Sequence, residues 1–357
     1  MLFSCGKRHA PATEQGSGQR ANNGSKSLVV DIHCHRESYK AGDIMKAEAE
    51  RVGRAGLSFG SELTKKTNQK QLLDIRPKMT SVDERLADMD RQGVDIQAIS
   101  ISPYQYYYWA EAEMGRDMSR LMNDELAEVA AATPDRFVAL GTIPLQNTEM
   151  AIAELERCVK DLGMRGVEIA TNINGDELSD PRLEKFWAKA EELDIVVFLH
   201  PAQFTHPERL TKHYFVNLFG HPMDTSLAIG YLIFDGVLKR YPGLKICIAH
   251  GGGWLPAYSA RMDHAHAARP DCREVISELP STYLKKLYFD TMVFEPGQLG
   301  YLIEKFGAEH IVLGTDYPYD MGETDPVGLV GKVKGLDQGA KDCICGLNAA
   351  KLLKIPH

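Results

Sequence analysis

The chain has 357 residues, of which 44% are hydrophobic and 25% are charged, and its formal net charge is -8 at pH 7. This composition predicts a soluble globular protein with enough apolar residues for a sizeable core. The acidic balance, with a pI near 5.9 and no cluster of basic residues, argues against a nucleic-acid-binding surface and against a polybasic membrane anchor.

The sequence shows neither a membrane span nor a secretion signal. No apolar run approaches the roughly 20 residues that a spanning helix needs, and the basic start at Lys7 and Arg8 leads into polar sequence rather than a signal-peptide core. We therefore expect a cytoplasmic protein. The seven cysteines form no dense framework, so we expect free thiols rather than structural disulfides.

The first 26 residues differ in character from the rest of the chain. Residues 6–26 are rich in Gly, Ser, Asn and Gln and lack hydrophobic periodicity, which predicts a flexible N-terminal tail over residues 1–26. From Ser27 onward, short apolar strands alternate with amphipathic helices, a pattern typical of repeated βα units around a parallel sheet. We assign residues 27–357 to one such domain.

Eight strands are predicted in this domain. They cover Leu28–Asp31, Ile96–Ser100, Phe137–Leu140, Gly166–Ile169, Ile195–Leu199, Lys245–Ala249, Leu287–Asp290 and His310–Leu313. Predicted helices between them include Val82–Arg91, Asn147–Leu162, Arg182–Leu193 and Gln298–Phe306, several of them preceded by Asp, Ser or Asn as candidate caps.

Eight βα repeats predict an α/β fold of the (β/α)8 TIM-barrel type. A doubly wound open sheet is the alternative, but it usually has fewer strands and a Gly-rich loop after the first one. The segment Arg36–Lys78 shows little strand pattern, so we expect a long loop excursion after the first strand, over the mouth of the barrel.

The first strand leads into the sequence Asp-Ile-His-Cys-His at residues 31–35. In an extended strand, His33 and His35 would share one face, with Ile32 and Cys34 on the other. Two imidazoles side by side form half of a metal site, although surface or hydrogen-bonded histidines would show the same spacing. His264 and His266 repeat that spacing on a predicted helix, where we expect a solvated face.

Further ligand-type residues follow other predicted strands. His200 follows the fifth strand, His250 the sixth and Asp316 the eighth. Singly, each could be a turn or capping residue, but a closed barrel would bring them to one mouth together with the two histidines of the first strand. The sequence therefore predicts a metal centre at the carboxyl ends of the strands.

Three neutral imidazoles and a carboxylate suit a divalent ion, with zinc as the first choice and manganese or iron as alternatives. His250 is a candidate base beside water activated by that ion. Arg261, on the helix after Gly251 to Gly253, is either a clamp for a substrate carboxylate or a solvated helix arginine. Tyr317 is a candidate substrate contact because it adjoins Asp316.

These residues closely resemble the amidohydrolase superfamily, and within it the branch of metal-dependent nonoxidative decarboxylases that includes aminocarboxymuconate-semialdehyde decarboxylase and 5-carboxyvanillate decarboxylase. The resemblance extends from about Ser27 to the C-terminus. Its motifs are Asp-Ile-His-Cys-His at 31–35, Gly-Val-Glu-Ile-Ala-Thr at 166–171, Phe-Leu-His-Pro at 198–201, Ala-His-Gly-Gly-Gly at 249–253 and Leu-Gly-Thr-Asp-Tyr-Pro at 313–318.

The resemblance implies one divalent ion held by His33, His35, His200 and Asp316, with His250 as acid or base. The fourth strand offers Glu168 rather than the lysine that bridges two metals in hydrolytic relatives, which favours one ion. Glu168 could orient a metal-binding histidine or pair with a neighbouring cation.

The resemblance also implies how substrate is bound. Arg261 would grip a substrate carboxylate, across a subunit interface in some relatives, which predicts a homodimer. Arg76 would be a second such arginine, although the long first loop departs from the family pattern.

The implied reaction is removal of carbon dioxide from an aromatic or muconate-like carboxylate, without an organic cofactor and with His250 or Asp316 handling the proton. The alternative is a hydrolase or hydratase that uses the same metal site on a related carboxylate-bearing compound.

Overall fold

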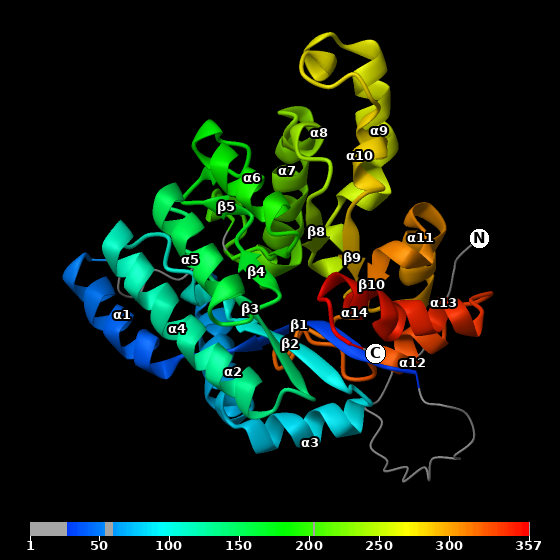
Figure 1. Cartoon of the computed structure of the whole chain (residues 1–357). Coiled ribbons are helices and arrows are strands. Elements are labelled where there is room, and N and C mark those ends of the chain that lie inside the picture. The colour runs from blue at the N-terminus through cyan, green and yellow to red at the C-terminus, as the bar shows by residue number, and fades with distance from the viewer. Residues whose placement is uncertain (1–26, 54–59, 203, 357) are drawn as a thin grey trace, which may run out of the picture.

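The computed structural model describes residues 27–53, 60–202 and 204–356 (Figure 1). The predicted tail, residues 1–26, lies outside this part of the chain, so the boundary at Ser27 stays a prediction.

A parallel sheet of eight strands forms the centre of the molecule, in the order β1-β2-β3-β4-β7-β8-β9-β10. The strands are β1 (Val30–Arg36), β2 (Ile96–Ile101), β3 (Phe137–Gly141), β4 (Gly166–Ile169), β7 (Val196–Leu199), β8 (Lys245–Ile248), β9 (Tyr288–Asp290) and β10 (Ile311–Val312). A small antiparallel pair, β5 (Asn172–Ile173) and β6 (Asp176–Glu177), lies outside this sheet. The predicted (β/α)8 barrel is confirmed.

The barrel closes between β1 and the chain that follows β10. The amide of Ile32 donates to the carbonyl of Leu313 at 3.0 Å, the amide of Asp316 to that of His33 at 2.8 Å, and the amide of His35 to that of Tyr317 at 2.7 Å. β1, which also pairs with β2 as far as Arg36, extends five residues beyond the predicted end at Asp31. His33 and His35 therefore lie within the strand rather than after it.

A β-bulge interrupts β1. Asp31 pairs with Gln97 and Cys34 with Ile99, so that Ile32 and His33 together face one residue of β2. Ile32 consequently packs with the side chains of the barrel interior, whereas Cys34 packs in the outer layer. The expectation that Ile32 and Cys34 share a face was wrong, because the extra residue resets the alternation of the strand.

Alternate residues of each strand face two different apolar layers. Val196 and Phe198 pack in the interior of the barrel, whereas Val197 and Leu199 pack against the surrounding helices. The interior layer continues into α14 (Asn348–Leu352), whose Leu352 lies in the same cluster. The barrel is thus filled with side chains, as in other barrels of this type.

Helices surround the sheet. They are α3 (Val82–Gln92), α4 (Ala112–Ala132), α5 (Thr148–Lys160), α6 (Glu184–Glu192), α7 (His221–Phe234), α8 (Val237–Arg240), α9 (Leu255–Ala268), α10 (Pro280–Leu284), α11 (Pro296–Phe306), α12 (Pro326–Gly331) and α13 (Gln338–Asp342). The four helices predicted by name are confirmed, with ends that differ by no more than two residues. Asn147 caps α5 by accepting a hydrogen bond from the amide of Met150.

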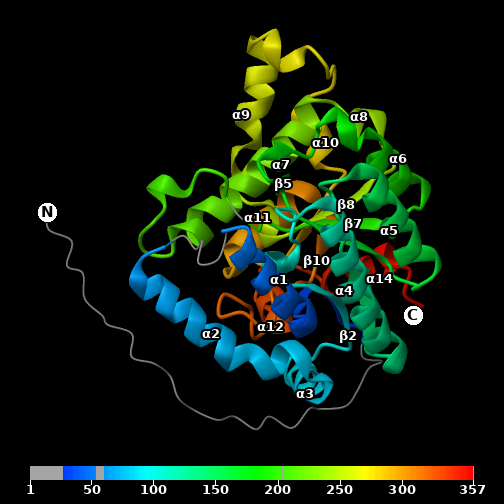
Figure 2. The ribbon, with the colours of Figure 1, turned by 90° about the vertical axis from the view of Figure 1, so that its left-hand side faces the viewer.

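The predicted loop excursion over Arg36–Lys78 is largely helical. It contains α1 (Tyr39–Arg51), which lies beside α4, and α2 (Glu62–Thr80), which lies beside α3 (Figure 2). Ser38 and Ser61 cap the two helices. The sequence hides both because few of their residues are buried, so neither has the apolar stripe by which a helix is usually recognised.

Helix α9 projects from the body of the barrel, as two views at right angles show (Figures 1 and 2). Its His264 is exposed, as predicted, but His266 is buried and its Nε2 donates to the carbonyl of Ile276 at 3.0 Å. The expectation of a solvated pair was therefore wrong for His266, because the segment after α9 folds back over it.

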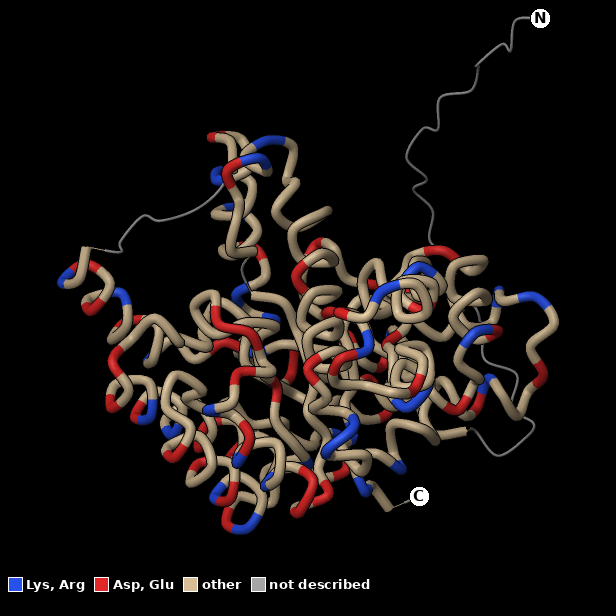
Figure 3. The backbone as a smooth tube through the Cα atoms, turned by 90° about the horizontal axis from the view of Figure 1, so that it is seen from above, with Lys and Arg blue, Asp and Glu red and all other residues tan. Residues whose placement is uncertain are grey.

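Charged residues of both signs are interspersed along the outer helices (Figure 3). Within the described residues, no helix is both long enough and apolar enough to cross a bilayer.

The close approach of β4 to β7 leads to a test of the barrel. A Cβ atom at Gly166 would lie 2.2 Å from the carbonyl oxygen of Val196, whereas one at Gly230 on α7 would meet nothing within 4 Å. Gly166→Ala should lower the free energy of unfolding by about 2 kcal/mol through overpacking. Gly230→Ala should raise it by roughly 0.5–1 kcal/mol through helix propensity. Urea midpoints measured by circular dichroism check both, and equal midpoints would contradict this account.

Candidate metal centre

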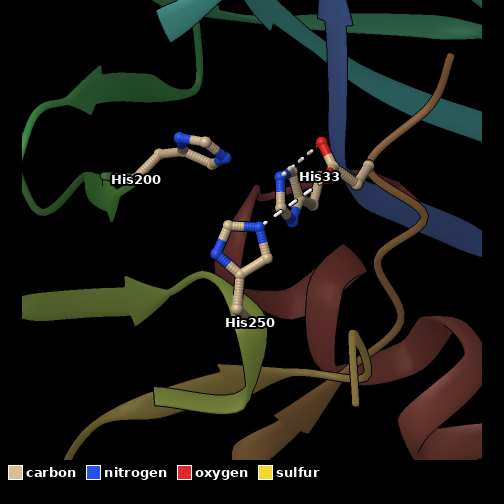
Figure 4. A group of neighbouring side chains, drawn as sticks. His33, His200 and His250 are labelled. Atoms are coloured by element: carbon tan, nitrogen blue, oxygen red, sulfur yellow. Dashed lines mark ion pairs between the residues drawn. The ribbon is translucent and has the colours of Figure 1, made fainter. Parts of the chain in front are cut away.

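The predicted ligand residues converge at the carboxyl ends of the strands. His33 and His35 project from β1, His200 follows β7, His250 follows β8 and Asp316 follows β10. The rings of His33, His200 and His250 point toward one another from three different parts of the chain (Figure 4). The closed barrel therefore assembles one group from residues almost 300 positions apart.

Three of these side chains form a tight triangle. Nε2 of His33 lies 3.2 Å from Nε2 of His35, and both are close to Oδ1 of Asp316, at 3.5 and 3.2 Å respectively. Two ligands held about 2.1 Å from one ion at a tetrahedral angle are about 3.4 Å apart. The triangle has the dimensions of one face of a tetrahedral site.

His200 and His250 complete the group. Each ring centroid of His33, His35 and His250 lies 4.9 Å from that of His200. Nε2 of His250 lies 3.7 Å from Oδ2 of Asp316, on the carboxylate oxygen that the triangle does not use. His250 and Asp316 both have positive φ angles, 56° and 54°, so the strand ends turn sharply where these side chains enter the site.

Four buried ring nitrogens of this group lack hydrogen-bond partners among the described residues. Both ring nitrogens of His200, Nδ1 of His35 and Nδ1 of His250 have no hydrogen-bond partner. Burying an imidazole without a partner is unfavourable, whereas a divalent ion would satisfy the lone pair of His200. The donor set thus fits one divalent metal ion.

Two overlapping sets of ligand residues are compatible with this geometry. One possible set of ligand atoms, all within 4.8 Å of one another, comprises His33, His200, His250 and Asp316. The triangle described above contains His35 instead of His250. The predicted assignment, with His35 as a ligand and His250 beside the ion, remains a proposal.

Electrostatics favour the metal-binding forms of two of these residues. Burial, together with the neighbouring histidines, lowers the pKa of His200 well below its usual value, so its ring is neutral at pH 7. Burial alone would raise the pKa of Asp316, but hydrogen bonds to His250, His33 and His35 outweigh it and hold the pKa well below its usual value. A neutral imidazole and an ionised carboxylate are the forms that bind a metal.

Asp290, at the end of β9, is a partner of this site that the sequence reasoning missed. Its Oδ2 lies 2.6 Å from Nδ1 of His33, and its Oδ1 accepts hydrogen bonds from the amides of Gly251 at 2.8 Å and Met292 at 3.1 Å. It thus orients His33 and anchors the turn after His250. Its place at the end of the seventh predicted strand was the available signal.

Glu168 lies on β4, buried beside His35. Its Oε1 accepts a hydrogen bond from the hydroxyl of Tyr106 at 2.5 Å and lies 3.7 Å from Nδ1 of His35, which is too long for a direct hydrogen bond. Its Oε2 has no partner among the described residues. The position agrees with an orienting role, which remains a proposal.

The three predicted substrate contacts lie apart from the histidines. The hydroxyl of Tyr317 donates to Asp88 on α3 at 2.7 Å, the guanidinium of Arg76 stacks 4.2 Å above the ring of Tyr39, and Arg261 is exposed on α9. The ring next to His35 belongs instead to Tyr319, with centroids 5.5 Å apart. The sequence reasoning missed Tyr319.

His221, at the start of α7, is a third neighbour of the site that the sequence reasoning missed. Burial, and then the charge of nearby His250, lowers its pKa to about 4, so it is neutral at pH 7. It follows a π-helical turn, Val216–Gly220, a feature that frequently occurs at functional sites but leaves no clear mark in a sequence.

Comparison with known proteins identifies the family. The model of the family described as Amidohydrolase matches residues 30–355. This chain belongs to the amidohydrolase family. The resemblance predicted from the sequence motifs is therefore confirmed.

Two relatives illustrate the branch of the family. A 2-amino-3-carboxymuconate-6-semialdehyde decarboxylase from Dictyostelium discoideum is 34% identical over 92% of each chain. A gamma-resorcylate decarboxylase from Rhodococcus jostii is 29% identical over 71% of this chain and 80% of its own. Both names describe removal of a carboxylate, which the predicted reaction shares.

A solved structure shares the fold. The 5-carboxyvanillate decarboxylase from Novosphingobium aromaticivorans, with bound manganese and 3-methoxy-4-hydroxy-5-nitrobenzoic acid, superimposes with a TM-score of 0.81 at 21% identity. The match covers 92% of this chain and 97% of that one.

The contact between Asp290 and His33 leads to a test of the centre. Asp290→Asn keeps an acceptor for the amides of Gly251 and Met292 but places an amide group beside Nδ1 of His33. The affinity for Zn²⁺ or Mn²⁺ should fall about 10–100-fold, because the ring loses the partner that sets its tautomer.

Competition with a chromophoric chelator measures this affinity. Asp117→Asn, which changes an exposed aspartate on α4, is the matched control and should leave it unchanged. Unaltered affinity in Asp290→Asn would show that Asp290 has no part in metal binding.

Proposed function

We propose that this protein is a metal-dependent nonoxidative decarboxylase that acts on an aromatic or muconate-like carboxylate. The observation that carries the proposal is the buried group of His33, His35, His200 and Asp316, with His250 on the second oxygen of the same carboxylate. The decarboxylase activities named for its relatives support the reaction class.

We propose one divalent ion, held by His33, His35, His200 and Asp316. Zinc is the first candidate because three imidazoles dominate the donor set, and manganese, which is bound in a related structure, is the competing candidate. When bound, the ion would act as a Lewis acid that polarises the substrate and stabilises developing negative charge. We propose no organic cofactor.

His250 and Asp316 are the groups that would move the proton. For a phenolic acid, a ring carbon must gain a proton before carbon dioxide leaves. Protonated His250 could donate it, or Asp316 could donate it after taking the proton of the phenolic hydroxyl. For a muconate, His250 would instead take a proton from the water that adds to the double bond. The 3.7 Å separation of His250 from Asp316 keeps both within reach of one reacting atom.

We propose that Arg261 grips the substrate carboxylate of a neighbouring subunit. Its helix, α9, leads away from the barrel, and Arg261 lies six residues beyond the first residue of that helix, about 9 Å along its axis. An exposed arginine at this position is better placed to reach the site of a second copy than to reach the site of its own barrel. The functional unit would then be a homodimer.

An exposed apolar face beside Arg261 supports this dimer. We define the apolar face by its seven large side chains, each more than a third exposed: Leu218, Phe219, Met223, Leu227, Tyr231, Trp254 and Tyr258. Phe219, in the π-helical turn before α7, and Trp254, directly before α9, stack with ring centroids 6.4 Å apart, which joins the two parts of the face.

The size and position of the apolar face fit a second copy of this chain. From the exposed fractions, it offers about 600 Å² of apolar surface, more than most monomers expose in one patch and close to the ~800 Å² per partner of a stable interface. Trp254, Tyr258 and Arg261 follow one another at helical spacings of four and three residues, so they share one side of α9.

Carbon dioxide release tests the reaction. We expect the purified protein to release carbon dioxide from at least one member of a panel of hydroxybenzoates and 2-amino-3-carboxymuconate semialdehyde. Chelation should abolish turnover, and one equivalent of Zn²⁺ or Mn²⁺ should restore it. Hydrolysis or hydration of related carboxylates without carbon dioxide would contradict the proposal and favour the alternative use of the same site.

Mixing two inactive variants tests the shared site. Arg261→Ala and His250→Asn should each lower kcat/KM at least about 100-fold. In a mixed dimer, one site has both native residues if Arg261 acts across the interface. With equal amounts of the two variants and random exchange of subunits, half of the dimers are mixed and each has one complete site of two. The mixture should therefore recover about one quarter of the native activity.

The control is a mixture of each variant with itself, which should remain inactive. Absence of recovery, with mixed dimers verified by native mass spectrometry, would show that Arg261 does not act in the partner's site.

A further inference from the structure

A fully buried arginine lies on the opposite side of β1 from the histidines. Arg85, in the first turn of α3, has no exposed surface, and its guanidinium packs 4.8 Å from the ring of Tyr317. It donates hydrogen bonds to the carbonyl of His35 and to the carbonyl of Lys78. Among the described residues, no carboxylate forms an ion pair with it.

The charge of Arg85 is connected to a buried carboxylate through an amide. Its Nη1 donates to Oε1 of Gln97 at 3.0 Å, and Nε2 of Gln97 donates to Oδ2 of Asp31 at 3.0 Å. Gln97 and Asp31 are also fully buried. Arg85 and Asp31 are therefore a buried cation and a buried anion that are bridged by Gln97. We call these three residues the relay.

The relay ends on the backbone that carries the proposed ligands. Oδ1 of Asp31 accepts the amides of His33 and Thr315, each at 3.1 Å, and Oδ2 accepts the hydroxyl of Thr315 at 2.7 Å. Thr315 immediately precedes Asp316. At its other end, Arg85 binds the carbonyl of His35, so the relay contacts the backbone of His33 and His35 and of the residue before Asp316.

The β-bulge allows this arrangement. In a regular strand of the same residues, Asp31 would share a face with His33 and His35 and would enter the group of candidate ligands. With it, Asp31 joins Gln97 in the layer below α3, while the two histidines face the barrel mouth.

Burying two separated charges is costly, and a direct ion pair or an apolar core would be the cheaper arrangement for stability alone. A network that binds the backbone of His33, of His35 and of the residue before Asp316 is instead suited to holding a site in one geometry. The Asn123 network gives a comparison: it is equally buried and joins Thr142 to Glu154, but none of its partners belongs to the metal group.

We propose that Arg85, Gln97 and Asp31 are positioning residues that hold His33, His35 and Asp316 in metal-binding geometry from the reverse side of β1. The inference rests on the proposed metal centre. It assigns a role in metal affinity to residues that contact neither metal nor substrate.

The test reverses the direction of one hydrogen bond. Gln97→Glu keeps the contact with Arg85 but sets a carboxylate against Asp31, so the metal dissociation constant should rise about 10-fold or more. In the double variant Gln97→Glu with Asp31→Asn, an amide again donates to a carboxylate, with the groups exchanged. The hydroxyl of Thr315, which donates to Oδ2 of Asp31 in the native protein, then has to accept from the new amide. This variant should return to within a few-fold of the native value.

Three measurements on the full chain distinguish the outcomes: the dissociation constant for Zn²⁺ or Mn²⁺ by chelator competition, the visible spectrum of the Co²⁺-loaded protein, and the urea midpoint. Asn123→Leu should lower the urea midpoint and leave the metal constant and spectrum unchanged. Gln97→Glu should alter both, and the double variant should restore both.

A Gln97→Glu variant that loses stability like Asn123→Leu but binds metal like the native protein would contradict the proposed positioning role of the relay. It would not contradict the proposed metal centre. A double variant that regains the urea midpoint but not the metal affinity would also contradict the positioning role. A native protein that binds no divalent ion would overturn the proposed centre and the relay together.

Discussion

The closure of the barrel between β1 and the chain after β10 is the contact on which the site depends. The first and last strands carry His33, His35 and Asp316, and these residues meet because the amide of Asp316 bonds to the carbonyl of His33 and the amide of His35 to that of Tyr317. An open sheet would leave the same side chains on opposite edges. The backbone hydrogen bonds that complete the fold are thus the ones that assemble the candidate ligands.

His33, one of these candidate ligands, is also held from a second direction. Asp290 binds the ring of His33 on β1 and also the turn after His250, which follows β8, so one carboxylate holds both segments in place. The close triangle of two imidazoles and a carboxylate concentrates lone pairs among buried side chains, an arrangement that is unfavourable without a partner for them. The site is best understood as a strained, preorganised arrangement whose cost is balanced by the surrounding hydrogen bonds and, when an ion is bound, by coordination.

Much of the fold and of the candidate site could be predicted from the sequence, and the reasons differ between the strands, the helices and the site residues. The period of two in the first strand placed His33 and His35 on one face, and the alternation of apolar runs with amphipathic segments predicted the eight strands. These are local patterns with strong signals. Helices α1 and α2 were missed because they bury few residues, and the real end of β1 was missed because it depends on pairing with Tyr317, more than 280 residues away. Asp290, His221 and Tyr319 could not be recognised as neighbours of the site, since their spacing along the chain does not reveal a contact that forms in three dimensions.

The β-bulge in β1 has a consequence for how this chain can change over evolutionary time. A sequence change that removed the bulge while keeping all of these residues would turn one half of the strand over. Either His33 and His35 would point into the helical layer, or Asp31 would point into the mouth. The two faces of this strand therefore depend on keeping the bulge at Ile32 and His33, which is a property of the backbone geometry rather than of any one side chain.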